Sequence, residues 1–240
     1  MSPFRTLVLA SLLIVVAPVT AQMPNGEFIE VKGATAAVVL AHGRAQGPDG
    51  LVVAPLRRAI AKEAGLHTLS LQMPVLATPD YLAYASTFPD AYETLQAAIT
   101  FLSTEKGVKR IYVLGYSMGA RMTTGFLAAR ETPPVVGYIG VGVLQGGGEP
   151  LDANINIHKL HLPVLDLYAD ATPLDLSSAE NRRALVGAQY RQVRITGANH
   201  SFKGYESVLS QTAVAWLREQ EGQEATDKPA SADGGKQRVP

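Results

Sequence analysis

The chain of 240 residues is long enough for one sizeable α/β domain and too short for two domains of ordinary size. Lysine and arginine total 21, as do aspartate and glutamate, so the sequence lacks the basic excess that favours binding to nucleic acid. Hydrophobic residues make up 47% of the chain, which is typical of a globular protein, and the absence of cysteine excludes disulfides and a thiol nucleophile.

Residues 1–21 have the composition of a secretory signal peptide. Arg5 supplies the positive charge, residues 7–17 form an apolar core, and Val19-Thr-Ala21 is a small-residue cleavage site. The apolar run is shorter than the roughly 20 residues that span a bilayer, so we expect cleavage after Ala21, with an uncleaved anchor as the alternative. This pattern predicts a bacterial periplasmic or secreted protein without stable membrane insertion after cleavage.

Segments of strand type and of helix type alternate along the rest of the chain. An edge strand is expected at 27–31, and buried strands at 34–41, 67–74, 110–116, 135–143, 162–169 and 190–196. Helical patterns occupy 51–64, 89–102, 120–130, 177–186 and 204–220. This alternation predicts a three-layer α/β/α sandwich around a mostly parallel sheet, with the site at the carboxyl ends of the strands. We place the domain at 22–220 and expect the polar tail, 221–240, to be disordered.

A G-x-S-x-G motif lies where the strand at 110–116 meets the following helix. In Gly115-Tyr-Ser-Met-Gly119 the sharp turn predicts a nucleophile elbow, which would hold Ser117 in a rare backbone conformation above the sheet. Glycine suits both ends of the motif because the strand and helix backbones pass too closely there for a Cβ atom. Because so short a motif also arises by chance, a nucleophilic Ser117 requires a histidine and a carboxylate at the same edge.

One of the five histidines follows a strand late in the chain. His200 lies after the strand at 190–196 and before the closing helix, so we expect it at the edge of Ser117, as the general base. His67, His158 and His161 precede strands and are expected at the opposite edge. His42 ends a strand, but the His-Gly step that follows is typical of a turn that presents a backbone N–H.

Two aspartates compete for the role of orienting His200. Asp170 directly follows the strand at 162–169, and we favour it because strand ends place side chains more rigidly than loops do. Asp175 could reach the same place by a different path of the loop, or could lie at the start of the next helix as a cap. Asp166 lies inside the strand and is expected to be structural.

The chain order Ser117, Asp170, His200 is that of the α/β-hydrolase superfamily. The sequence resembles its small lidless esterases and dienelactone-hydrolase-like members over residues 27–220, in the elbow, in Leu40-Ala-His-Gly-Arg44 and in Gly197-Ala-Asn-His200. The resemblance implies an oxyanion hole made by the backbone N–H groups of Arg44 and Met118, although the Arg44 guanidinium could instead hold a substrate anion. The turn that carries Asp170 is shorter than in the superfamily. Dienelactone hydrolases use a cysteine that this chain lacks, so their substrate does not carry over.

These observations predict a serine hydrolase that acts on a carboxylic ester or a related small acyl substrate. Tyr116, Tyr81 and Tyr84 are candidates for the substrate pocket, with packing in the core as their alternative. We expect no cofactor, and no metal because His158 and His161 have no third ligand nearby. The rival interpretations are a non-catalytic binding or envelope-assembly protein on the same scaffold and a serine peptidase of this fold.

Overall fold

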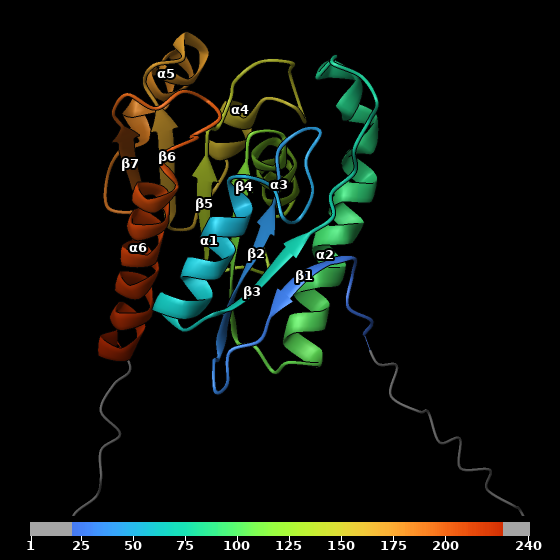
Figure 1. The fold of residues 1–240 in the computed structure, drawn as a ribbon, viewed down its shortest axis with the longest axis vertical. Coiled ribbons are helices and arrows are strands. Elements are labelled where there is room, and N and C mark those ends of the chain that lie inside the picture. The colour runs from blue at the N-terminus through green and yellow to red at the C-terminus, as the bar shows by residue number, and fades with distance from the viewer. Residues whose placement is uncertain (1–20, 228–240) are drawn as a thin grey trace, which may run out of the picture.

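The computed structural model describes residues 21–227; residues 1–20, with nearly all of the expected signal peptide, and residues 228–240 lie outside the described part. Within it, seven strands form one sheet in the order β1-β3-β2-β4-β5-β6-β7 (Figure 1). Only β1 runs antiparallel, against β3, and the other neighbours are parallel. The strands are β1 Gly26–Ile29, β2 Ala36–Ala41, β3 His67–Leu71, β4 Arg110–Tyr116, β5 Gly137–Val141, β6 Val164–Ala169 and β7 Tyr190–Ile195.

Helices cover both faces of this sheet (Figure 1). One face carries α1 (Val53–Ala59), which continues as a π-helix through Ile60–Ala64, together with α6 (Glu206–Asp227). The other carries α2 (Phe88–Thr104) and α3 (Met118–Ala128). The shorter elements are a 3-10 helix at Leu82–Thr87, α4 at Ala153–Ile157, α5 at Pro173–Asn181 and a 3-10 turn at Arg183–Leu185. The predicted three-layer arrangement is confirmed.

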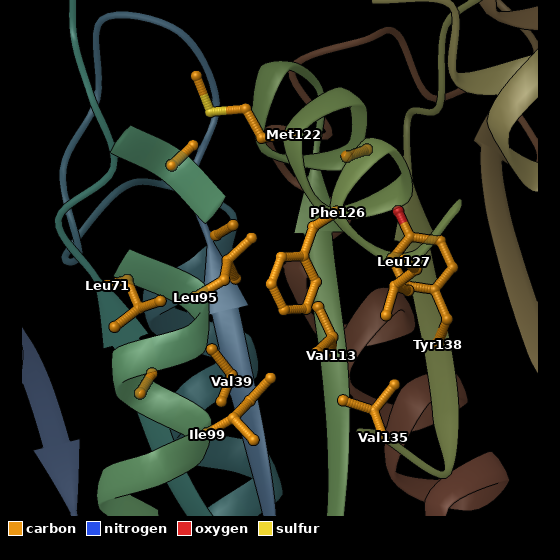
Figure 2. Close-up of a cluster of buried hydrophobic side chains, with 14 of the residues drawn as sticks. Val39, Leu71, Leu95, Ile99, Val113, Met122, Phe126, Leu127, Val135 and Tyr138 are labelled. Atoms are coloured by element: carbon orange, nitrogen blue, oxygen red, sulfur yellow. The ribbon is translucent and has the colours of Figure 1, made fainter. Parts of the chain in front are cut away.

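Each central strand contributes to two hydrophobic cores because successive side chains point to opposite faces of a sheet. In β2, fully buried Val39 belongs to the core that Leu95 of α2 and Phe126 of α3 complete (Figure 2). Its neighbour Leu40 belongs to the core on the opposite face, which Trp216 of α6 helps to close. Burying such a side chain stabilises the fold by about 1.5–3 kcal/mol. The two cores therefore fix the sheet as the rigid base from which the functional loops extend.

Three helices differ from the sequence expectation. The start of α5 is Pro173 rather than residue 177, because proline fits a first helical turn, where its missing N–H is not needed. In a stretch expected to be irregular, α4 forms because Asp152 accepts hydrogen bonds from the N–H groups at its start. The last helix, α6, runs past 220 to Asp227, and Glu221 accepts a hydrogen bond of 2.7 Å from Tyr112 of β4. Residues 221–227 of the expected tail are thus helical, and its remainder, 228–240, lies outside the described residues. Among residues 21–227, none of the helices combines the length and apolarity that crossing a bilayer requires.

Candidate active site

Ser117 lies between β4 and α3 with φ 53° and ψ −112°, a conformation that side-chain-bearing residues rarely adopt. Two close backbone contacts hold it there. A Cβ atom on Gly115 would stand 2.6 Å from the Cα of Ala120, and one on Gly119 would stand 2.3 Å from the carbonyl oxygen of Ala41. Glycine is thus required at both positions, as the motif predicts, and the turn lifts the serine hydroxyl above the end of the sheet.

A hydrogen-bonded chain of three side chains starts at this hydroxyl. The Oγ of Ser117 lies 2.8 Å from Nε2 of His200, and Nδ1 of His200 lies 2.8 and 3.0 Å from the two carboxylate oxygens of Asp175. The carboxylate can only accept, so Nδ1 carries the proton and Nε2 is left to accept the serine proton. This is the arrangement in which an imidazole can act as a base toward the hydroxyl.

The expectation that Asp170 orients His200 is wrong. The Asp170 carboxylate instead accepts a hydrogen bond of 2.7 Å from the N–H of Gly197, in the turn that leads to His200. Thr172 accepts a hydrogen bond of 2.9 Å from the His200 N–H, so the connection between β6 and α5 holds the backbone of the histidine loop. Asp175, buried in the first turn of α5, holds the ring. Pro173 is the feature of the sequence that could have favoured Asp175. Proline is typical of a first helical turn, so it indicates that the helix begins before Asp175 and holds this residue rigidly.

The loop after β2 lies beside the serine. His42 is buried, and its Nδ1–H donates to the carbonyl of Gly43 at 2.8 Å while its Nε2 accepts from the N–H of Met73 at 3.1 Å. Burial lowers the pKa of His42, which keeps the ring neutral as this pattern requires. Because C=O and N–H point in opposite directions in a trans peptide, the Arg44 N–H is directed away from His42.

Arg44 and Met118, the expected oxyanion donors, both line a cavity of about 680 Å³ together with Ser117 and His200. Met118 is the first residue of α3, so its N–H has no acceptor within the helix. Neither backbone N–H donates to another residue in the range 21–227. The Arg44 guanidinium lies at the exposed side and donates to the carbonyl of Pro79. Both expected donors thus belong to residues that line the cavity, and their N–H groups have no acceptor among residues 21–227.

The three tyrosines proposed for substrate binding have different positions. Tyr81 is partly exposed and lines the cavity. Tyr116 also lines it, but its ring stacks on the His200 imidazole with centroids 5.7 Å apart, and its hydroxyl donates to the His200 carbonyl at 3.0 Å. Burial and then the charge of Asp175 raise the pKa of Tyr116 to about 12, so the hydroxyl keeps its proton. Tyr84 is completely buried, bonded to the backbone of Leu76, and is part of the core rather than of the pocket.

The sequence reasoning assigned no role to Arg121, which is almost completely buried and lines the same cavity. Its position four residues after Ser117, one helical turn along α3, was the only signal.

In the described part of the chain, no three histidine, aspartate or glutamate side chains gather as a metal site would need. The side chains that the structure brings to the cavity include the hydroxyl of Ser117, the imidazole of His200 and the guanidinium of Arg121.

In comparisons of sequence, no family model and no curated protein matches the chain. Solved structures do match its fold. A dienelactone hydrolase from Anabaena variabilis is 20% identical with a TM-score of 0.65, and the match covers 84% of this chain and 95% of that one. The chain has the α/β-hydrolase fold.

Two further structures share this α/β-hydrolase fold at low identity. Est1E from Butyrivibrio proteoclasticus, solved with ferulic acid bound, is 14% identical with a TM-score of 0.62, covering 84% of this chain and 95% of that one. An α/β serine hydrolase without a lid, from Xanthomonas campestris, is 17% identical with a TM-score of 0.58, covering 82% of this chain and 86% of that one. The α/β-hydrolase fold of this chain is thus shared with esterases and serine hydrolases.

Proposed function

We propose that this protein is a serine hydrolase that cleaves a carboxylic ester or a related acyl compound. The hydrogen-bonded chain from Ser117 through His200 to Asp175 carries the proposal, since it supplies a nucleophile, a base and an orienting carboxylate at one end of the sheet. The strained backbone of Ser117 supports it further, because strain of this kind is maintained at functional sites.

In the proposed mechanism, Ser117 Oγ attacks the carbonyl carbon while His200 Nε2 takes its proton. Asp175 holds the ring and stabilises the imidazolium that forms. The backbone N–H groups of Met118 and Arg44 bind the oxyanion of the tetrahedral intermediate, helped by the positive end of the α3 dipole. The intermediate collapses as His200 protonates the leaving alcohol, and water then attacks the acyl-enzyme with His200 as the base, which releases the acid and restores Ser117.

The cavity favours an acyl substrate of small or moderate size. Its volume of about 680 Å³ lies within the range of small-molecule sites. Esterases and a lidless serine hydrolase are among the proteins that share the fold, and these likenesses support an ester more than a peptide as the substrate. We also propose that the chain is exported, on the pattern of residues 1–21; mass analysis of the protein isolated from cells would show whether it begins at Gln22.

A fluorophosphonate probe tests the proposal directly. Such probes phosphonylate an activated serine, so we expect covalent labelling at Ser117, lost on prior denaturation, and hydrolysis of 4-nitrophenyl esters. A matched panel of peptide substrates separates an esterase from a peptidase. A folded protein that is neither labelled nor active on any ester or peptide would instead support a non-catalytic binding protein on this scaffold.

A further inference from the structure

Arg121 is a buried positive charge in the wall of the proposed active site. Its backbone N–H donates to the Ser117 carbonyl at 3.2 Å, which places it one helical turn from the serine. The residue is only 4% exposed and lines the cavity. Its Nη1 donates to the carbonyls of Gly146 and Leu151 at 2.7 and 2.5 Å, and Nη2 donates to that of Gln145 at 2.9 Å.

This charge has no carboxylate partner in the described part of the chain, where no acidic oxygen lies within 4.0 Å of its guanidinium. The nearby carboxylate of Asp152 is occupied, accepting hydrogen bonds from the N–H groups of Gly146 and Asn154. Burial accordingly lowers the pKa of Arg121. Arg182, which is also buried, behaves differently: burial acts in the same direction on its pKa, but the charges and hydrogen bonds of Asp166 and Tyr190 together outweigh burial and raise the pKa.

The guanidinium also keeps hydrogen-bonding capacity that the protein does not use. It has five N–H donors, and the three carbonyls leave Nε–H and one Nη2–H without an acceptor among residues 21–227. Nε and Nη2 share one edge of the planar group, and two donors on one edge match the two oxygens of a carboxylate. The Tyr81 ring lies 5.0 Å from the guanidinium and covers it from one side.

Other groups at the cavity also contribute positive charge. Arg44 is a second arginine in its lining, and the N-terminus of α3 directs its positive dipole end there. No aspartate or glutamate is among the described residues that line the cavity. The cavity therefore attracts a negatively charged ligand, and a ligand carboxylate would neutralise the buried charge of Arg121, which has no carboxylate partner among residues 21–227.

We propose that the substrate is an ester that bears a second, ionised carboxylate, and that Arg121 binds this carboxylate while Ser117 attacks the ester carbonyl. The inference rests on the proposed serine-hydrolase function. Arg44 at the exposed side adds long-range attraction for the same anion. The alternative is that Arg121 only holds the loop of residues 145–151 through its carbonyls, which would make the enzyme indifferent to charge on the substrate.

Matched ester pairs test the inference on the wild-type protein. The first pair is the mono-4-nitrophenyl ester of adipic acid and the same compound with its distal carboxyl methylated, so only the charge differs in the acyl part. The second pair, 4-acetoxybenzoate and its methyl ester, moves the charge to the leaving group. We expect kcat/KM to be about tenfold to a hundredfold higher for the anionic member of at least one pair, the range typical of a hydrogen bond to a charged group. Ratios at or below one in both pairs would overturn the inference.

Variants of Arg121 test whether this residue binds the substrate carboxylate. Arg121→Gln should reduce the ratio of the preferred pair to near one, while activity on the neutral ester reports whether the loop and the serine site remain intact. If Arg121→Gln does not fold, Arg121→Lys, which keeps the charge but loses the bidentate edge, should reduce the ratio severalfold. An unchanged ratio in a folded Arg121 variant would overturn the assignment of the anion to this residue. Arg44→Gln is the matched surface control, and we expect it to weaken the preference less and to make it less sensitive to salt.

Failure of this inference differs from failure of the proposed function. Hydrolysis of the neutral esters together with labelling of Ser117, without any preference for the anionic esters, would remove the carboxylate proposal alone. Absence of labelling and of activity on all four esters would remove the serine-hydrolase function, and the substrate proposal with it.

Discussion

The backbone of Ser117 has a positive φ that costs about 1–3 kcal/mol in a residue with a side chain. The contacts around Gly115 and Gly119 maintain it, because the strand and the helix leave no room for the turn to relax. The conformation brings Oγ to 2.8 Å from His200 before any substrate is present. At the residue scale, the site is therefore assembled in advance, and its function should depend on single atoms.

Removing the Ser117 hydroxyl tests that dependence. If the proposed function holds, we expect Ser117→Ala to lower kcat for ester hydrolysis by about 10⁶, the loss typical of established Ser-His-Asp triads, because the nucleophile is lost. The melting temperature should change little, since alanine fits where serine does. Kinetics with 4-nitrophenyl esters and a thermal melt measure the two effects, and retention of most of the activity would rule out the proposed mechanism.

The two aspartates give a paired prediction. Asp175→Asn should lower kcat by about 10⁴, because an amide in place of the carboxylate stabilises the wrong histidine tautomer and no longer stabilises the imidazolium. Asp170→Asn is the matched control, because its side chain bonds the N–H of Gly197 and does not contact the ring. Steady-state kinetics should show a far smaller loss for the control, and equal losses would contradict the assignment of Asp175.

At the scale of elements, the site is held by connections that follow two pairs of neighbouring strands, β2 with β4 and β6 with β7. The elbow follows β4 and the histidine loop follows β7, while the β6–α5 connection supplies Asp170, Thr172 and Asp175 to hold that loop. The connection after β2 is tied to the end of β3 through the buried ring of His42. Parallel strands bring these segments to one edge, so each connection positions its neighbour.

The buried ring of His42 predicts a dependence of stability on pH. Burial lowers its pKa in the folded protein below the ordinary 6.5, so the unfolded chain binds more protons as the pH falls below that value. The contribution of His42 to the free energy of unfolding should be complete above about pH 7 and should decline from about 6.5 toward the lower, folded pKa. Urea denaturation at several pH values measures this decline.

His42→Asn is the comparison for that measurement, because an asparagine amide can still donate toward the Gly43 carbonyl but does not titrate. Its stability should fall less steeply between pH 7 and 5 than that of the wild type. Identical slopes for the two proteins would show that His42 does not contribute to acid sensitivity.

At the scale of the whole molecule, two hydrophobic cores on opposite faces hold the sheet. A buried polar network also connects strands β6 and β7 to the segments that pack beside them. Arg182 and Asp166 are both fully buried, 2.9 Å apart, and the Tyr190 hydroxyl donates to the same carboxylate at 2.7 Å. Arg182 also donates to the carbonyl of Val143 and to the side chain of Asn154. The network links β6, β7, α4 and the loop after β5, which lies next to the cavity.

Breaking this network should destabilise the protein globally. We expect Arg182→Met to lower the free energy of unfolding by about 3–5 kcal/mol, because it leaves the Asp166 carboxylate buried without a countercharge. Adding Asp166→Asn to that variant removes the uncompensated charge and should recover part of the loss. Urea denaturation of the single and double variants measures both changes. A loss of unfolding free energy below about 1 kcal/mol in Arg182→Met would contradict the expected cost of the unpaired charge.

The sequence by itself determined the features that depend on local spacing and on sheet topology. Alternating strands and helices require a parallel layered sheet, the glycines around Ser117 require a sharp turn, and the position of His200 after a strand requires the same edge as the serine. Those inferences rest on backbone geometry, which a short run of residues specifies.

Only the tertiary structure decided which side chains meet. Asp170 and Asp175 both lie at the correct edge, and the choice between them depends on where α5 begins and on which carboxylate its first turn directs at the ring. In the same way, Tyr84 is in the core and Arg121 is buried without a countercharge because of packing between segments far apart in the chain. Distance between side chains and the loss of their water are set by that packing, and a linear pattern of residues specifies neither.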